Sequence, residues 1–170
     1  MAVARIDVNT VMQTLIMRDK SYKCAIGRSG ALSEATKREG DGATPMGIFP
    51  IRYLYWRPDR LAKPDTALDT FALSPRNGWC DDPADANYNR PVILPYSASL
   101  EKLWRDDHLY DLILVMGHND DPPIKEMGSA IFVHIAQPDY TPTEGCIALT
   151  QGDLLNVLQQ VDPGTYIHIR

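Results

Sequence analysis

A cysteine and a histidine in the last third of the sequence have side chains suited to nucleophilic acyl transfer. Cys146 follows Gly145, and His134 lies upstream near the end of an apolar run. A free thiol has a pKa of about 8.5, and a neighbouring imidazole that accepts its proton raises the thiolate fraction. Gly145 leaves backbone N–H groups open as an oxyanion hole, in which one donor contributes about 3 kcal/mol. The residues predict a Cys146 nucleophile with a His134 base, although a structural cysteine has the same appearance in sequence.

The segments around this pair predict regular elements that would position it. The apolar run 130–135 predicts a strand with Phe132 and His134 on one face and its isoleucines and valine on the other. After the cysteine, the residues from Thr150 to Asp153 have the pattern of a helix capping box. The elements expected near the pair are a strand over 130–135, a buried strand over 112–116 and a helix over 151–160.

The rest of the chain is predicted to be extended and rich in turns. Thirteen prolines and eleven glycines favour turns and ordered loops over long helices. No internal repeat or linker is visible, so residues 1–170 are predicted to form one domain, mainly β with short helices. The other expected elements are a hairpin over 10–16 and 21–26, a strand over 48–55, a short helix over 97–106 and a last strand over 165–169.

Charge and hydropathy exclude several classes of protein. The net charge of −5 and the lack of a basic block argue against a nucleic-acid partner. No apolar segment reaches the ~20 residues of a membrane span. Polar residues interrupt residues 1–20, so no secretory signal is expected and the cytoplasm is the predicted location. Export to the periplasm, with a signal removed from the sequence, is the alternative.

The remaining cysteines and the histidines do not predict a metal site. They are dispersed without zinc-binding spacing, so neither a metal nor another cofactor is expected. Three cysteines, an odd number, suit a reducing compartment. Cys24 and Cys80 are therefore expected to be buried thiols, with a disulfide between them as the alternative.

Several motifs together resemble one known family. The segment 143–149, TEGCIAL, downstream of His134, resembles the signature of the YkuD family of L,D-transpeptidases. The segment 38–51, REGDGATPMGIFPI, resembles the upstream motif of the same family, and GHNDDPP followed by GSAIFVHI resembles a branch of that family. The resemblance extends from about Cys24 to Ile169. It implies a YkuD-like β-sandwich or open barrel with short flanking helices.

The resemblance also implies a reaction. Cys146 would be the nucleophile and His134 the base, and the substrate would be a peptidoglycan tetrapeptide stem or muropeptide. The thiol would attack the carbonyl of the third residue, a diamino acid joined through its L centre, and expel the terminal D-alanine. The acyl group would then pass to an amine, forming a crosslink, or to water.

The sequence departs from the family pattern next to the nucleophile. The family usually has a second histidine where Glu144 stands, and an Arg or Asn where Ala148 stands. A carboxylate beside a thiolate raises the thiol pKa, which opposes activation, so Glu144 is expected to point away or to pair with a cation. The residues predicted to contact the peptide stem are His118, Trp79, Tyr88, Asn89, Arg90, Thr143 and Glu144.

The predicted location decides between the possible acceptors. Peptidoglycan outside the membrane cannot be crosslinked from the cytoplasm, whereas soluble muropeptides can be trimmed there. The sequence therefore favours an L,D-carboxypeptidase of murein recycling. The alternatives are an L,D-transpeptidase in the periplasm and, from another class, a catalytically inactive module that binds peptidoglycan stems.

Overall fold

The longest strand, β5 (Thr44–Trp56), organises the computed structural model, which describes residues 4–170. Its second half pairs antiparallel with β10 (Leu112–Met116), and its first half pairs antiparallel with β13 (Tyr166–Ile169). Thus β5 joins the two halves of the main sheet. The strands predicted over 48–55, 112–116 and 165–169 are confirmed, with β5 beginning earlier.

The main sheet is nearly closed. Its strands follow the order β12 (Ile147–Leu149), β11 (Phe132–Ile135), β10, β5, β13, β1 (Arg5–Asn9), β2 (Thr14–Met17) and β3 (Lys20–Lys23). Beyond this order, β4 (Ala31–Ser33) and β6 (Thr70–Ala72) pair parallel with β5. Bridges from Ala25 to Ala148 and from Gly27 to Thr143 bring the chain after β3 to β12. The segment that holds the predicted nucleophile therefore lies where the sheet closes.

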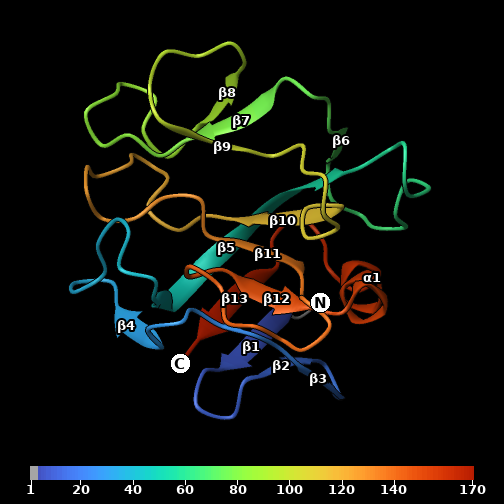
Figure 1. Cartoon of the computed structure of the whole chain (residues 1–170). Helices are drawn as coiled ribbons and strands as arrows, with labels where there is room; N and C mark the ends of the chain where they lie inside the picture. The colour runs from blue at the N-terminus through green and yellow to red at the C-terminus, as the bar shows by residue number, and fades with distance from the viewer. Residues whose placement is uncertain (1–3) are drawn as a thin grey trace.

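A second, small sheet lies over one side of the main sheet (Figure 1). Its central strand is β7 (Asn77–Cys80), which pairs antiparallel with β8 (Pro91–Ile93) and β9 (Leu100–Lys102). In Figure 1 it stands at the top, above β10 and β5. The long connection between β5 and β10 thus supplies a cover for the main sheet.

The core divides into two clusters on the two faces of β11. Ile131, Val133 and Ile135 belong to the larger cluster, which also takes the buried face of the helix α1 (Gln151–Leu158). Phe132 belongs to the second cluster, beneath the small sheet. The alternation predicted for 130–135 is confirmed, and it directs His134 toward the small sheet.

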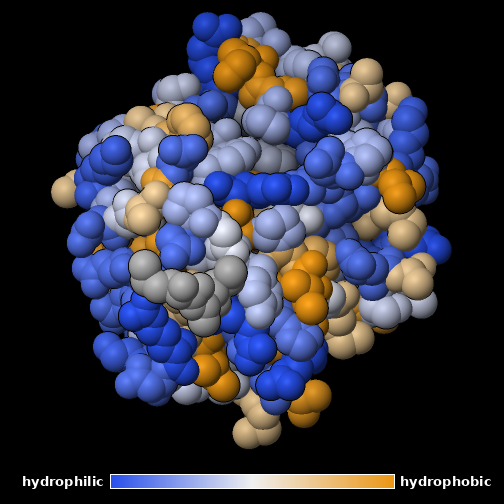
Figure 2. Space-filling model, turned by 180° about the vertical axis from the view of Figure 1, so that it is seen from behind, coloured by the Kyte–Doolittle hydropathy of each residue, from blue (hydrophilic) through white to orange (hydrophobic). Residues whose placement is uncertain are grey.

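The helix α1 begins as its cap predicts. Thr150 Oγ1 accepts a hydrogen bond of 3.2 Å from the Asp153 N–H, and Leu154, Val157 and Leu158 are buried. Within residues 4–170, no helix is long and apolar enough to cross a membrane. The face turned away from the viewer in Figure 1 carries hydrophobic patches interspersed among hydrophilic side chains (Figure 2).

Two of the predicted elements differ from the structure. The helix predicted over 97–106 is wrong, because residues 100–102 form the strand β9. The i, i+3, i+4 spacing of its apolar residues arises instead from packing: Leu103 is fully buried under the small sheet, and Trp104 stacks on the Arg57 guanidinium at 3.6 Å. The N-terminal hairpin is confirmed, but its first strand starts at Thr14, after a turn.

Candidate active site

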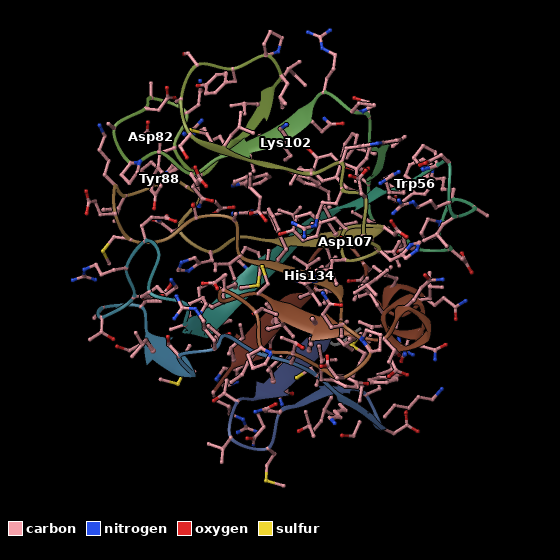
Figure 3. The ribbon with its side chains drawn as sticks, viewed as in Figure 1. Trp56, Asp82, Tyr88, Lys102, Asp107 and His134 are labelled. Carbon is pink, nitrogen blue, oxygen red and sulfur yellow. The ribbon has the colours of Figure 1, made fainter. Side chains whose placement is uncertain are left out.

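Cys146 and His134 line one cavity of about 580 Å³ between the small sheet and the main sheet. Figure 3 shows His134 near the centre of the molecule, below the small sheet that carries Lys102. The two side chains come from neighbouring strands, because β11 pairs parallel with β12, and Val133 lies opposite Ile147. This pairing places Cys146, just before β12, level with the start of β11.

Backbone groups at the start of β11 hold the Cys146 thiol. Its Sγ accepts a hydrogen bond of 3.3 Å from the Phe132 N–H and donates one of 3.3 Å to the Ala130 carbonyl. The side chain is 8% exposed, and burial raises the pKa of the thiol to about 12. The thiol is therefore protonated at neutral pH.

His134 is oriented as a proton acceptor. Its Nδ1–H donates to the Ile135 carbonyl at 2.9 Å, which leaves Nε2 with a free lone pair. The ring packs edge-on against Tyr110, with centroids 5.2 Å apart. Burial lowers the pKa of His134 to about 4, so the imidazole is neutral at neutral pH.

Burial favours a neutral pair over a preformed thiolate and imidazolium, because it raises the pKa of Cys146 and lowers that of His134. The His134 side chain leaves the same face of β11 as Phe132, about 6.6 Å further along the strand. The thiol bound at Phe132 and the imidazole therefore face one cavity without an ion pair between them.

The backbone at Gly145 is fixed by two threonines. Thr44 Oγ1 donates to the Gly145 carbonyl at 2.8 Å, and the Gly145 N–H donates to Thr143 Oγ1 at 3.1 Å. Gly145 has a φ of +137°, and a Cβ there would lie 2.8 Å from the Ala43 carbonyl oxygen. Glycine is thus required by backbone conformation and close packing. The Gly145 N–H, expected to be open to a substrate, is instead occupied by Thr143.

Comparison with known families identifies this arrangement. The family model described as the YkuD L,D-transpeptidase catalytic domain matches residues 3–169. The chain belongs to the YkuD family. No curated protein sequence matches the chain.

Solved structures share the fold of this YkuD domain. The helical cell shape determining protein Pgp2 from Campylobacter jejuni is 16% identical with a TM-score of 0.53, covering 99% of this chain and 47% of that chain. L,D-transpeptidase 3 from Mycobacterium tuberculosis, in complex with a faropenem-derived adduct, is 11% identical with a TM-score of 0.50, covering 99% and 60%. The YkuD domain thus spans between about half and three-fifths of the length of these two proteins. At this identity the likeness shows the fold alone.

The Glu144 carboxylate pairs with a cation, one of the two arrangements expected from the sequence. Arg28 Nε donates to both Glu144 carboxylate oxygens at 3.0 Å, and the side chain of Glu144 is 77% exposed. The carboxylate is therefore paired with a cation at the rim of the cavity. The hydrogen bond to Glu144 raises the pKa of Arg28.

The residues predicted to contact the peptide stem fall into separate groups. Thr143 and Glu144 line the cavity that holds Cys146. A second cavity of about 150 Å³ is lined instead by His118, Trp79, Asn89 and Arg90. Tyr88 lines neither of these two cavities.

Asn89 supports the backbone that holds the thiol. Its Oδ1 accepts from Trp79 Nε1 at 2.9 Å and from the Ala130 N–H at 3.0 Å, while its Nδ2 donates to the carbonyls of His118 and Asn119. The Ala130 carbonyl in turn accepts from the Cys146 thiol. The geometry gives Asn89 a positioning role behind the cavity wall.

Several lining residues were not identified from the sequence as cavity residues. They include Lys37, Glu39, Asp81, Glu101, Arg105, Tyr110 and Ser129. Glu39 carried a signal, since it belongs to the 38–51 motif that resembles the family's upstream segment. Ser129 lies in the GSAIFVHI segment, whereas the others lie in segments without a recognisable motif, and only the tertiary fold brings them to the cavity. Cys24 and Cys80 are buried free thiols, as expected, and no disulfide joins them.

Proposed function

We propose that the YkuD domain is an L,D-carboxypeptidase that removes the terminal D-alanine from peptidoglycan tetrapeptide stems. The observation that carries the proposal is the placement of the Cys146 thiol and the His134 imidazole on the wall of one cavity. Membership of the YkuD family supports the substrate class. A cavity of about 580 Å³ is of the size that encloses a small peptide.

Cys146 and His134 carry out the chemical steps in this proposal. As Sγ attacks the carbonyl carbon of the third stem residue, the thiol proton passes to His134 Nε2. The resulting imidazolium protonates the amine of the leaving D-alanine, and a thioester to Cys146 remains. Water then attacks the thioester, again losing a proton to His134, and the thiolate leaves and recovers that proton. These steps require no cofactor.

Two considerations support water as the acceptor. Hydrolysis requires no second groove for an acceptor peptide, and the strand β9 of the small sheet contributes Leu100 and Glu101 to the wall of the cavity. We place the activity in the cytoplasm, where soluble muropeptides are the substrates. An L,D-transpeptidase that uses the same thioester is the second candidate, favoured by the family description itself. A binding module without catalysis would have no need of the Cys146–His134 pair.

The decisive experiment follows the products of a disaccharide-tetrapeptide by mass. Release of D-alanine without dimers supports the carboxypeptidase, whereas dimers or exchange of D-alanine for another D-amino acid support transfer. Cys146→Ala should abolish either reaction. Cys80→Ala removes another buried thiol, outside the cavity, and should leave the reaction intact. Full activity of Cys146→Ala would refute the mechanism.

A further inference from the structure

Three carboxylates that the proposed mechanism does not use line the cavity beside Cys146. They belong to Glu39, Asp81 and Glu101, which we call the acidic wall. Among residues 4–170, none of the three forms an ion pair with a cationic side chain. Uncompensated carboxylates in a cleft favour a positively charged ligand.

The small sheet places two members of the wall side by side. Glu101 on β9 lies opposite Trp79 on β7, and the Asp81 N–H donates to the Ser99 carbonyl at 3.2 Å, which extends the pairing. Since alternate residues of a strand share a face, Asp81 and Glu101 point to the same side, with Cβ atoms roughly 7 Å apart. Trp79, on that same face, packs on Phe132 with ring centroids 5.0 Å apart. The shared face is therefore the one turned toward the main sheet.

The wall retains free hydrogen-bond acceptors. Glu101 accepts from the Tyr110 hydroxyl, and Glu39 accepts from the Tyr88 hydroxyl at 2.5 Å. Asp81 Oδ1 is buried and has no hydrogen-bond partner within residues 4–170. A carboxylate offers about four lone-pair sites, so each of the three can accept further hydrogen bonds from a ligand.

A hydroxyl in the same cavity independently points to a polar ligand. Ser129 is only 8% exposed, lines the cavity, and its Oγ has no partner among residues 4–170. The two cations of the cavity are already neutralised: Lys37 Nζ lies 2.7 Å from Asp41, and Arg105 pairs with Asp107. The buried polar groups that remain are thus acceptors in excess of donors.

The acidic wall lies close to the reacting sulfur. Burial, followed by the negative charge of Glu101, raises the pKa of the Cys146 thiol. Burial also raises the pKa of Glu101; the hydrogen bond from Tyr110 and the charge of Arg105 oppose this rise, and the charges of Asp81 and Glu39 add to it. A cation bound at the wall would offset this mutual repulsion. Among residues 4–170, no group of three or more histidine, cysteine, aspartate or glutamate side chains could hold a metal ion, which favours an organic cation.

We propose that the acidic wall binds the free side-chain ammonium group of the diamino acid whose carbonyl Cys146 attacks. This assignment rests on the proposed function and specifies its substrate. An ammonium group has three donors and no acceptor, which complements Asp81, Glu101 and Ser129 Oγ. Charge-assisted hydrogen bonds of this kind distinguish strongly between a ligand that carries the ammonium and one that lacks it. Lysine and diaminopimelate stems both provide the group, and a stem with norleucine does not.

The test measures binding without turnover. In the Cys146→Ala variant, calorimetric titration with tetrapeptides that differ only in the third residue should show lysine and diaminopimelate stems binding about 10-fold or more tightly than the norleucine stem. When Glu101→Gln is added to Cys146→Ala, the affinity ratio between the lysine or diaminopimelate stem and the norleucine stem should fall to less than about 3-fold. Glu34→Gln, an identical change on an exposed side chain outside the cavity, should leave the ratio unchanged.

Each outcome bears on one proposal. Equal binding of lysine and norleucine stems, or an unchanged ratio in both Glu101→Gln and Asp81→Asn, would overturn the acidic wall as an ammonium site. A preference confined to diaminopimelate would also overturn it, because the ligand feature would then be the extra carboxylate. Circular dichroism of each variant establishes that it folds. Failure of the wild type to release D-alanine would refute the proposed function, while the binding ratio would still test the wall.

Discussion

Thr44 Oγ1 donates a hydrogen bond of 2.8 Å to the carbonyl of Gly145, and so ties the 38–51 motif to the residue before Cys146. Thr44 is fully buried and its hydroxyl also accepts from the Gly27 N–H at 2.9 Å. A trans peptide is planar, so the Gly145 carbonyl and the Cys146 N–H point in opposite directions. Holding the carbonyl therefore fixes the direction of the Cys146 N–H, the backbone amide of the nucleophilic residue itself.

Replacing Thr44 by valine should slow catalysis more than it weakens binding. Thr44→Val keeps the shape but frees the Gly145 carbonyl, so we expect kcat for D-alanine release to fall by about 10- to 100-fold, with KM changed less than about 3-fold. Steady-state kinetics on a tetrapeptide substrate measure both constants. The variant should also lose roughly 1–3 kcal/mol of unfolding free energy, because buried hydrogen-bonding groups are left unpaired.

Thr44→Ser is the matched control, since it restores the hydroxyl. It should recover most of kcat even if its melting temperature stays below that of the wild type. If the valine variant is folded and turns over at the wild-type rate, Thr44 does not orient the Cys146 amide.

The sequence was most informative where one strand or one turn determines the geometry. Alternation along 130–135 predicts the direction of His134, and the cap at Thr150 predicts the start of α1, because both depend on local contacts. The acidic wall could not be predicted in this way. Glu101 lies in a segment whose apolar spacing suits a helix, and only pairing with β7 makes it a strand beside Asp81. That pairing is tertiary, and it overrides local preference.

Asn89 should be required for stability because it holds the Ala130 backbone and the Trp79 ring. Asn89 also has a φ of +55°, which asparagine and glycine tolerate better than alanine. Asn89→Ala should therefore lower the free energy of unfolding by roughly 2–4 kcal/mol, from lost hydrogen bonds and backbone strain together. Denaturant unfolding measures the loss.

Asn89→Gly separates the two contributions. It removes the side chain without the backbone strain, so it should be less destabilised than the alanine variant. Equal stability of Asn89→Ala and the wild type would contradict the role assigned to this side chain.

Alkylation of Cys146 in the absence of substrate should be slow and strongly pH dependent. Burial raises the thiol pKa to about 12, so the thiolate fraction should rise about tenfold per pH unit up to pH 9, without a plateau. Glu101→Gln removes a negative charge that contributes to this shift, and should increase the rate at each pH. Iodoacetamide labelling followed by peptide mass mapping gives the rate at Cys146. A plateau near neutral pH would indicate a preformed thiolate and contradict the neutral pair.

Two buried histidines should make the fold sensitive to mild acid. Burial lowers the pKa of both His118 and His134 from 6.5 to about 4. Between these values the unfolded chain binds more protons than the folded one, so the free energy of unfolding falls as pH falls. For each histidine, the free energy of unfolding changes by at most about 1.4 kcal/mol per pH unit. Thermal unfolding between pH 7 and pH 4.5 measures this loss.

His118→Phe tests the assignment, because the His118 ring nitrogens have no hydrogen-bond partner within residues 4–170 and the ring already packs edge-on against Phe49. The variant removes one titrating group while keeping an aromatic ring. Its stability should fall with pH about half as steeply as that of the wild type over the same range, with His134 accounting for the remainder. An unchanged slope would mean that His118 does not stay neutral in the folded protein. The double variant with His134→Gln should then lose most of the pH dependence above pH 4.5, since the histidines with lowered pKa would both be gone.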